Sequence, residues 1–199
     1  MHAHATRSIK ERAVAAALAL VVALFADASV AEEPDPDKEG TFDQQTILKD
    51  ATDFLGDGTE GLGEVVEKLF ADLGEPNAYI KGQEASGALG VGARYGDGTL
   101  ITHAGAQSEV HWTGPSIGFD AGGNVSKVFV LVYDLPNVDA LFQRFPAVEG
   151  SIYVVGGISA NYHRSKGIAL APIRLGAGLR SGVNVGYMKY TREKTWNPF

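Results

Sequence analysis

The chain has 199 residues, with 17 lysines and arginines against 24 aspartates and glutamates, and it contains no cysteine. The absence of cysteine excludes disulfide bonds, cysteine metal sites, thiol catalysis and lipid attachment at a lipobox. A hydrophobic content of 45% beside 21% charged residues is typical of a chain that folds around a core. The net charge of −7 argues against nucleic-acid binding, which requires a basic surface.

Residues 1–31 have the pattern of a secretory signal peptide. Basic residues at positions 7, 10 and 12 precede an apolar run over residues 13–25, and small residues then lead to Ala31. The apolar run is too short for a helix that crosses the hydrocarbon core, so a retained membrane anchor is the less favoured alternative. Because the twin-arginine pair is missing, we predict export by the general secretory route and cleavage after Ala31.

An acidic spacer and two helices are predicted next. Residues 32–41 are predicted to be a disordered spacer. The segment is acidic, contains two prolines and has no apolar side chain over residues 32–40. Over residues 43–73 apolar side chains recur at helical spacing in two stripes, and Gly74 followed by Pro76 ends the second. We therefore expect two amphipathic helices, each with one face packed on the rest of a single domain over residues 42–199.

The remainder of the chain has the texture of β-structure. Of the 25 glycines, 18 lie in residues 86–191, among short runs of β-branched and aromatic residues. Glycine at this density is typical of tight turns and of strands that bend sharply in a small barrel. The pair Asp97-Gly98 indicates a hairpin turn. We predict strands over residues 78–85, 89–95, 98–103, 107–112, 125–133, 151–162, 168–179 and 183–191.

Three local patterns complete the predicted fold. Asn137 and Pro146 bracket a short helix over residues 138–145. Residues 125–133 are apolar on both faces, which predicts a strand between the barrel interior and an external helix. Over residues 173–180 apolar side chains alternate with small or basic ones, which predicts a strand with one solvated face. The predicted fold is mainly β (α+β): a small antiparallel closed β-barrel with two N-terminal helices and one inserted short helix.

Residues 114–118 match the G-x-S-x-G pattern of hydrolase nucleophile elbows, and Asp134 and His163 follow in triad order. An elbow requires a strand before the serine and a helix directly after it, but the residues that follow are poor helix formers. We therefore interpret the segment as a structural turn. The histidines lack the spacing of metal ligands and no calcium-loop pattern is present, so we predict no catalytic residues, no metal and no cofactor.

Candidate ligand contacts come from the predicted strands. Aromatic side chains such as Trp112 are suited to the mouth of a pocket for an apolar chain, with ordinary barrel core as the alternative. Arg174 and Arg180, on the predicted solvated face, are suited to an anionic head group, with an exposed charged surface as the alternative. Together with Ser116 and Asp120 they make up the predicted ligand-binding set.

Six stretches together resemble one known family. The stretches are residues 75–80, 82–87, 94–100, 114–120, 131–136 and 195–199. They resemble the envelope integrity protein A family of Gram-negative envelopes, whose biochemistry is unknown, over about residues 42–199. The resemblance implies a periplasmic protein, a small soluble β-barrel and a role in maintaining the cell envelope, and it supplies no catalytic residue. Residues 126–191 are also similar, more weakly, to SYLF-type lipid-binding domains.

Two function hypotheses follow. The favoured one is a non-enzymatic periplasmic protein that supports envelope integrity by binding a lipid or another envelope component, and that meets a membrane at most peripherally. The alternative is a hydrolase or transferase of envelope polysaccharide or lipid that uses Ser116 or the carboxylates of Asp120 and Asp134. An open pocket inside the barrel and an interior filled by side chains also remain as alternatives.

Overall fold

The computed structural model describes residues 40–56, 60–175 and 186–197, with the backbone alone for residues 87–91 and 116–124. The chain divides by its contacts into two units, and all described residues belong to the second, Asp37–Phe199. The predicted signal peptide and most of the predicted spacer lie outside the described residues. No described helix has the length and apolar character needed to cross a membrane.

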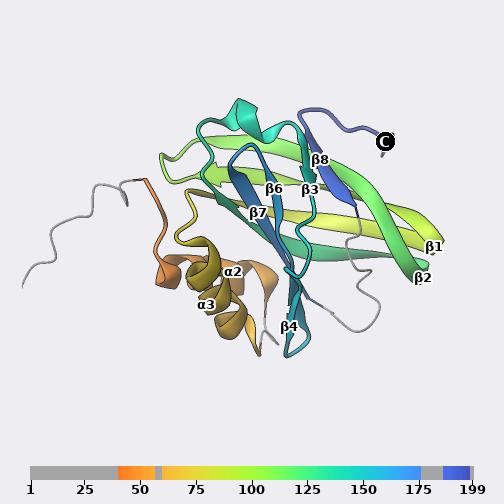
Figure 1. Ribbon diagram of the computed structural model, residues 1–199, viewed down its shortest axis with the longest axis horizontal. Coiled ribbons are helices and arrows are strands. Elements are labelled where there is room, and N and C mark those ends of the chain that lie inside the picture. The colour runs from red at the N-terminus through yellow and green to blue at the C-terminus, as the bar shows by residue number, and fades with distance from the viewer. Residues whose placement is uncertain (1–39, 57–59, 176–185, 198–199) are drawn as a thin grey trace, which may run out of the picture. The chain divides into compact units, whose positions relative to one another are not determined.

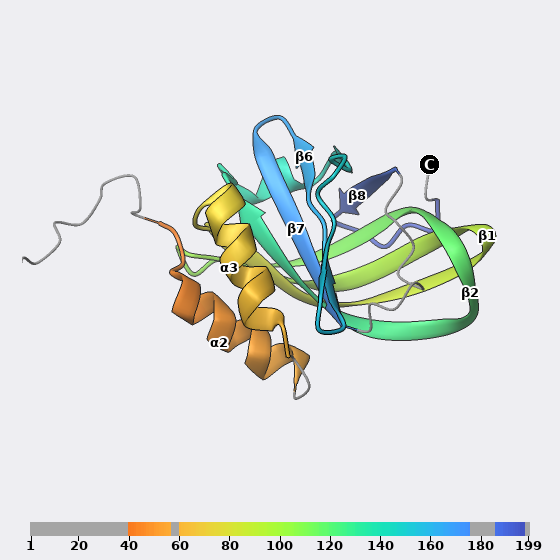
Figure 2. The same ribbon diagram turned by 60° about the horizontal axis from the view of Figure 1, so that its bottom comes forward.

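Both predicted N-terminal helices are confirmed: α2 spans Gln44–Leu55 and α3 spans Leu62–Leu73. Helix α2 begins where it does because the Asp43 carboxylate accepts hydrogen bonds from two backbone N–H groups of the first turn, one of them that of Thr46. Helix α3 ends at Gly74, whose φ of 80° lies in the left-handed region that favours glycine. Figure 2 shows the two helices on one side of the sheet.

The strands form one antiparallel sheet in which β2 holds the central place (Figure 1). The order is β3-β8-β2-β7-β5-β4, with β1 paired to β2 and β6 paired to β7. One end of β2 pairs with β8 and the other with β7, and a bridge from Ala147 to His163 connects the end of β3 to β6. Backbone pairing therefore runs from β2 through β7, β6, β3 and β8 and back to β2. The sheet curls as in a barrel. The strands are β1 Ala78–Thr102, β2 Gln107–Tyr133, β3 Arg144–Pro146, β4 Tyr153–Val155, β5 Ile158–Ala160, β6 His163–Ser165, β7 Ile168–Leu175 and β8 Tyr187–Thr191.

The predicted mainly β fold is confirmed, but several predicted strands are parts of longer ones. Strands β1 and β2 form one long hairpin whose turn lies at residues 103–106. The predicted turn at Asp97-Gly98 is wrong, because this pair lies inside β1. The predicted turn at residues 114–118 is wrong for the same reason, because the segment lies inside β2. Glycines here let a long strand bend instead of ending it.

The hairpin bends so far that two limbs of β1, residues 78–86 and 92–102, approach each other. The backbone N–H of His103 donates to the Asn77 carbonyl oxygen at 2.9 Å, across the two ends of the strand. A Cβ on Gly98 would lie 2.6 Å from the Lys81 carbonyl oxygen, closer than atoms can approach. Glycine is therefore required where the limbs cross.

The predicted inserted helix is much shorter than expected. Only Val138–Leu141 forms a helical turn, the 3₁₀ element η3, in which the Asn137 side chain accepts from a backbone N–H as its cap. The following residues pair with β8 as strand β3. The Phe145 ring is fully buried with its centroid 5.8 Å from that of Tyr190. Burial of this ring outweighs the local helical pattern.

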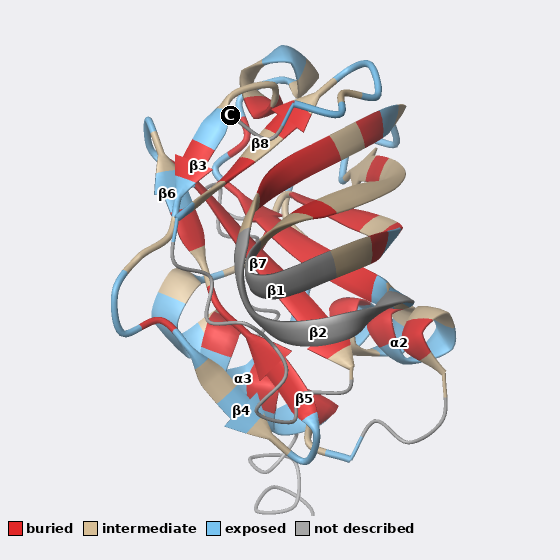
Figure 3. Ribbon diagram, turned by 90° about the vertical axis from the view of Figure 1, so that its right-hand side faces the viewer, coloured by how far each residue is buried: buried red, intermediate tan, exposed pale blue. Residues whose placement is uncertain are grey.

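Strand β2 divides the core into two clusters. Phe129 and Leu131 pack in the cluster that includes α2 and α3. Val128 and Val130 point to the opposite side, into the cluster inside the curled sheet. Figure 3 shows that the strands are buried over much of their length. The predicted strand with two apolar faces, between the helices and the barrel interior, is confirmed.

The same register continues in β7. Ala171 and Ile173 belong to the cluster under the helices, whereas Leu170 belongs to the cluster inside the curl. Arg174 follows Leu170 in that inward register and is only 9% exposed. The predicted solvated face is therefore wrong at Arg174, because the curl of the sheet covers it. Arg180 lies outside the described residues.

Candidate ligand-binding site

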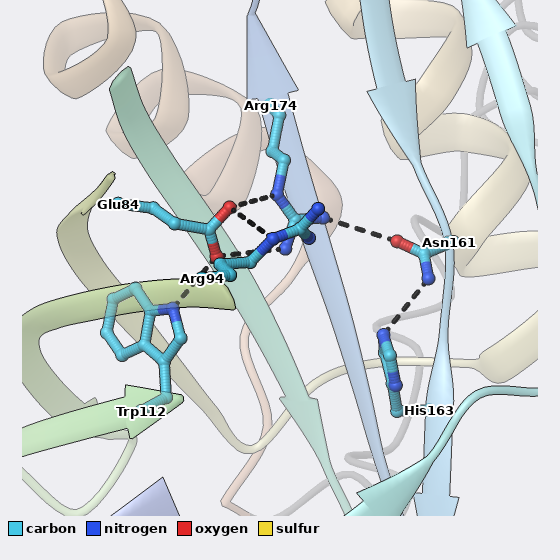
Figure 4. Close-up of polar contacts among 6 residues, drawn as sticks. All are labelled: Glu84, Arg94, Trp112, Asn161, His163 and Arg174. Carbon is cyan, nitrogen blue, oxygen red and sulfur yellow. Dashed lines mark hydrogen bonds and ion pairs between the residues drawn. The ribbon is translucent and has the colours of Figure 1, made fainter. Parts of the chain in front are cut away.

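Six polar side chains meet inside the curled sheet (Figure 4). On β1, β2, β7 and β8 the even-numbered positions face this interior, which is why strands far apart in sequence bring side chains to one place. The six residues are Glu84 and Arg94 on β1, Trp112 on β2, Asn161 just before β6, His163 on β6 and Arg174 on β7.

The Glu84 carboxylate is the centre of this interior cluster. Its Oε1 accepts from Arg174 Nε at 2.9 Å, and its Oε2 accepts from Arg174 Nη2 at 3.2 Å and from Trp112 Nε1 at 2.9 Å. Arg94 Nε lies 3.3 Å from Oε1 as an ion pair, but its N–H is not aligned with an acceptor. Burial alone would raise the pKa of Glu84, but the guanidiniums of Arg174 and Arg94 outweigh it and hold the pKa below its usual value.

A chain of hydrogen bonds extends from this ion pair to His163. Arg174 Nη1 donates to Asn161 Oδ1 at 3.2 Å, and Asn161 Nδ2 lies 3.0 Å from His163 Nε2. His163 Nδ1 lies 3.2 Å from the Phe145 carbonyl oxygen. These partners fit a neutral ring with its proton on Nδ1. Burial, with a smaller contribution from the Arg174 charge, lowers the pKa of His163 to about 4.

Apart from Arg94 Nε, which has an ion pair but no hydrogen bond, the polar groups of the interior cluster named above bond to protein partners. Trp112 is 2% exposed and packs against Tyr190, with ring centroids 5.8 Å apart, so side chains occupy this part of the interior. Two predicted ligand contacts, Trp112 and Arg174, therefore do lie together, joined through Glu84. The geometry indicates that the cluster stabilises the packing of β1, β2 and β7 against one another.

A pocket of about 220 Å³ borders this cluster at Trp112 and lies between the bent hairpin and the chain after β8. Its floor comes from both limbs of β1, where Gln83 Nε2 donates to Asp97 Oδ2 at 3.4 Å. The Trp112 indole reaches the pocket beside Gly96, whose missing Cβ leaves room for the ring. The lining residues are Gln83, Ala85, Tyr95, Gly96, Asp97, His111, Trp112, Val125, Thr191, Lys194, Thr195 and Trp196.

Two aromatic rings form one side of the pocket. The Tyr95 hydroxyl donates to the Trp196 carbonyl oxygen at 3.0 Å, and the two ring centroids lie 5.5 Å apart at an interplanar angle of 56°. Lys194 Nζ lies 4.7 Å from the centroid of the Trp196 ring, a cation–π contact. Although it is held by both neighbours, Trp196 remains 69% exposed.

The other predicted site residues that the structure describes lie on β2, and the backbone there is not that of a nucleophile elbow. Ser116 lies within β2 opposite Gly92, so the strand-turn-helix of a nucleophile elbow is absent, and Asp120 lies opposite Ala88. Asp134 is exposed at the end of β2, whereas His163 is buried and faces other partners. Within the described ranges, no three acidic or histidine side chains gather in a way that would hold a metal ion.

Sequence analysis missed Glu84 in the interior cluster and the contact between Tyr95 and Trp196 at the pocket. Glu84 shares the inward register of Ala78 and Ile80, and a carboxylate among apolar side chains signals a buried cation nearby. That signal was available in the sequence. The contact between Tyr95 and Trp196 joins residues 101 positions apart, and no local pattern predicts it.

Comparisons with known proteins agree with this fold. The family model of Envelope integrity protein A matches residues 40–199. A crystal structure from Brucella abortus, described as a beta-barrel-like uncharacterized protein, matches with a TM-score of 0.73 and 42% identity. This match covers 80% of the present chain and 99% of the Brucella abortus chain. A search of curated proteins gave no match. The chain therefore belongs to the envelope integrity protein A family.

Proposed function

We propose that this protein is a non-enzymatic periplasmic protein that supports envelope integrity by binding an envelope component in the pocket between β1 and residues 191–196. Membership of the family supports the envelope role. The signal-peptide pattern of residues 1–31 supports periplasmic export. The pocket supports ligand binding, because it combines a mainly apolar lining with a few convergent polar groups.

The exposure of apolar side chains is the observation that carries this proposal. Four large hydrophobic residues are exposed among those the structure describes, and two of them, Val125 at 65% and Trp196 at 69%, line this one pocket. Exposed apolar surface that gathers in a concave site is typical of a binding site. The cluster around Glu84 is a weaker candidate, because Glu84, Trp112 and Arg174 are already bonded to one another.

A non-enzymatic function fits the surroundings of the residues that an enzyme would use. Ser116 lies in a continuous strand, and the buried His163 ring is engaged by Asn161 and by the Phe145 carbonyl oxygen. A serine hydrolase needs the base within hydrogen-bond reach of an exposed nucleophile. The Asp134 carboxylate is exposed on the turn after β2, outside the set of residues that line the pocket.

The test is complementation of a deletion strain in the native host. Trp196→Ala should fail to restore growth on detergent and on a cell-wall antibiotic, at a protein level equal to wild type. Ile152→Ala is the matched control, because Ile152 is also exposed, at 47%, but does not line the pocket. Full restoration by Trp196→Ala would refute the proposed site.

Location is tested on the same strains. The protein should appear in the periplasmic fraction with an N-terminus at Glu32, as mass spectrometry of the purified chain would show. A chain that keeps residues 1–31 and sediments with membranes would instead favour the retained anchor.

A further inference from the structure

We infer that the pocket binds a neutral sugar unit of an envelope glycan. This inference rests on the proposed function, because it names the class of ligand for the same site. It follows from the rings, the polar groups and the charges that meet at the pocket.

The aromatic side of the pocket suits a flat, partly apolar ligand. Tyr95 and Trp196 lie at 56° to each other, so their rings form an open corner. The C–H face of a pyranose packs on such rings, while its hydroxyl groups point outward to polar partners. Because the Tyr95 hydroxyl holds the Trp196 main chain at 3.0 Å, the corner is formed before a ligand arrives.

The polar groups of the pocket suit hydroxyl groups. Gln83 and Asp97 offer an amide and a carboxylate, and their mutual hydrogen bond of 3.4 Å is long enough to be exchanged readily for bonds to a ligand. The His111 ring also lines the pocket and adds a third polar side chain to it.

Other ligand classes fit these groups less well. A cationic head group on the Trp196 ring would be repelled by the like charge of Lys194, whose Nζ lies 4.7 Å from the ring centroid. An anionic group would meet the Asp97 carboxylate. An acyl chain would strip water from Gln83, Asp97 and His111 without replacing their hydrogen bonds. A neutral ligand rich in hydroxyl groups avoids all three penalties.

The size of the pocket points to one unit of a longer chain. Its volume of about 220 Å³ is below the ~300 Å³ at which pockets for whole drug-sized ligands begin. Trp196 is 69% exposed, so the site is open beside it and a glycan could continue past it.

Intrinsic tryptophan fluorescence tests this inference directly, because the chain has only two tryptophans. Trp196 is exposed and Trp112 is buried, so a ligand that stacks on Trp196 should shift its emission to shorter wavelength. The probes are neutral tetrasaccharides of β-1,4-linked N-acetylglucosamine, β-1,4-linked glucose and α-1,4-linked glucose. We expect a saturable shift with at least one of them.

Variants connect that shift to the pocket. The Gln83→Ala variant, which keeps both tryptophans, should bind the responding tetrasaccharide at least tenfold more weakly, and Trp196→Ala should lose binding measured by calorimetry. The Ile152→Ala control should bind as wild type does, because Ile152 lies outside the pocket lining.

The outcomes separate the inference from the proposed function. A shift with phospholipid vesicles, abolished in Trp196→Ala, and none with any tetrasaccharide would overturn the glycan and leave the site. Full complementation by Trp196→Ala, with no response to any probe, would overturn both. Binding of a tetrasaccharide that Gln83→Ala and Trp196→Ala leave unchanged would overturn the assignment to this pocket.

Discussion

The buried histidine of the interior cluster should make the stability of this protein depend on pH above the range where carboxylates titrate. The pKa of His163 falls from an ordinary value of 6.5 to about 4, because burial disfavours the imidazolium. Between these two values the unfolded chain takes up a proton that the folded chain refuses. The contribution of His163 to the free energy of unfolding is therefore fully present above pH 6.5 and is lost as the pH falls from there toward pH 4.

The size of this loss follows from the two pKa values. Each pH unit between them is worth about 1.4 kcal/mol, so the free energy of unfolding should fall by about 2 kcal/mol between pH 8 and pH 5. The loss should level off at about 3 kcal/mol below pH 4, where His163 protonates in the folded state too. The charges that face this ring are those of Arg174, Arg94 and Glu84, and the first two oppose its protonation.

Urea unfolding at pH 8 and pH 5 measures this effect, with the emission of the buried Trp112 as the signal. The matched variant is His163→Asn, whose amide can still donate to the Phe145 carbonyl oxygen that His163 Nδ1 faces. The variant should lose about 2 kcal/mol less than wild type between the two pH values, because every other titrating group is shared. Equal losses in the two proteins would refute the placement of a neutral imidazole in the interior.

Three further outcomes are expected. Glu84→Gln should lower the free energy of unfolding by about 3–5 kcal/mol in the same assay, because two buried guanidiniums lose their counter-charge; a loss under 1 kcal/mol would contradict this. Gly98→Ala should cost about 1–3 kcal/mol through its backbone clash, whereas Gly63→Ala, in open space on α3, should cost nothing; equal effects would contradict the crossing of the limbs. Tyr95→Phe, which removes the bond to the Trp196 carbonyl oxygen, should weaken tetrasaccharide binding several-fold without changing stability by more than ~1 kcal/mol; unchanged affinity would show that this bond does not pre-form the pocket.

The helices and the central strand were predictable because their signals are local. Apolar spacing and the Asp43 and Gly74 caps define α2 and α3, and the two apolar faces of residues 125–133 require cover on both sides. Glycine was harder to interpret. In turns, glycine ends strands, but Gly98 instead lets the two limbs of β1 approach each other closely. Only the tertiary structure distinguishes these two roles of glycine.

The candidate sites were less predictable than the fold, because they depend on long-range pairing. Alternation along residues 173–180 predicts that Arg174 and Ile173 face opposite sides, but not which side is covered by another strand. The interior of a curled sheet buries both faces of β7, so a basic residue becomes the partner of Glu84 and not a surface charge. The pocket depends in the same way on residues 191–196, which carry no signal for their place beside β1.

The make-up of the pocket from both early and late segments has a consequence for when the protein can act. Its early lining residues lie between Gln83 and Trp112, and Lys194, Thr195 and Trp196 leave the ribosome after all of them. A partly synthesised chain can form the β1/β2 hairpin, but it has no Trp196 to pack against Tyr95. Under the proposed function, ligand binding would therefore begin only after residues 194–196 have been synthesised, and a shorter nascent chain would not bind the ligand.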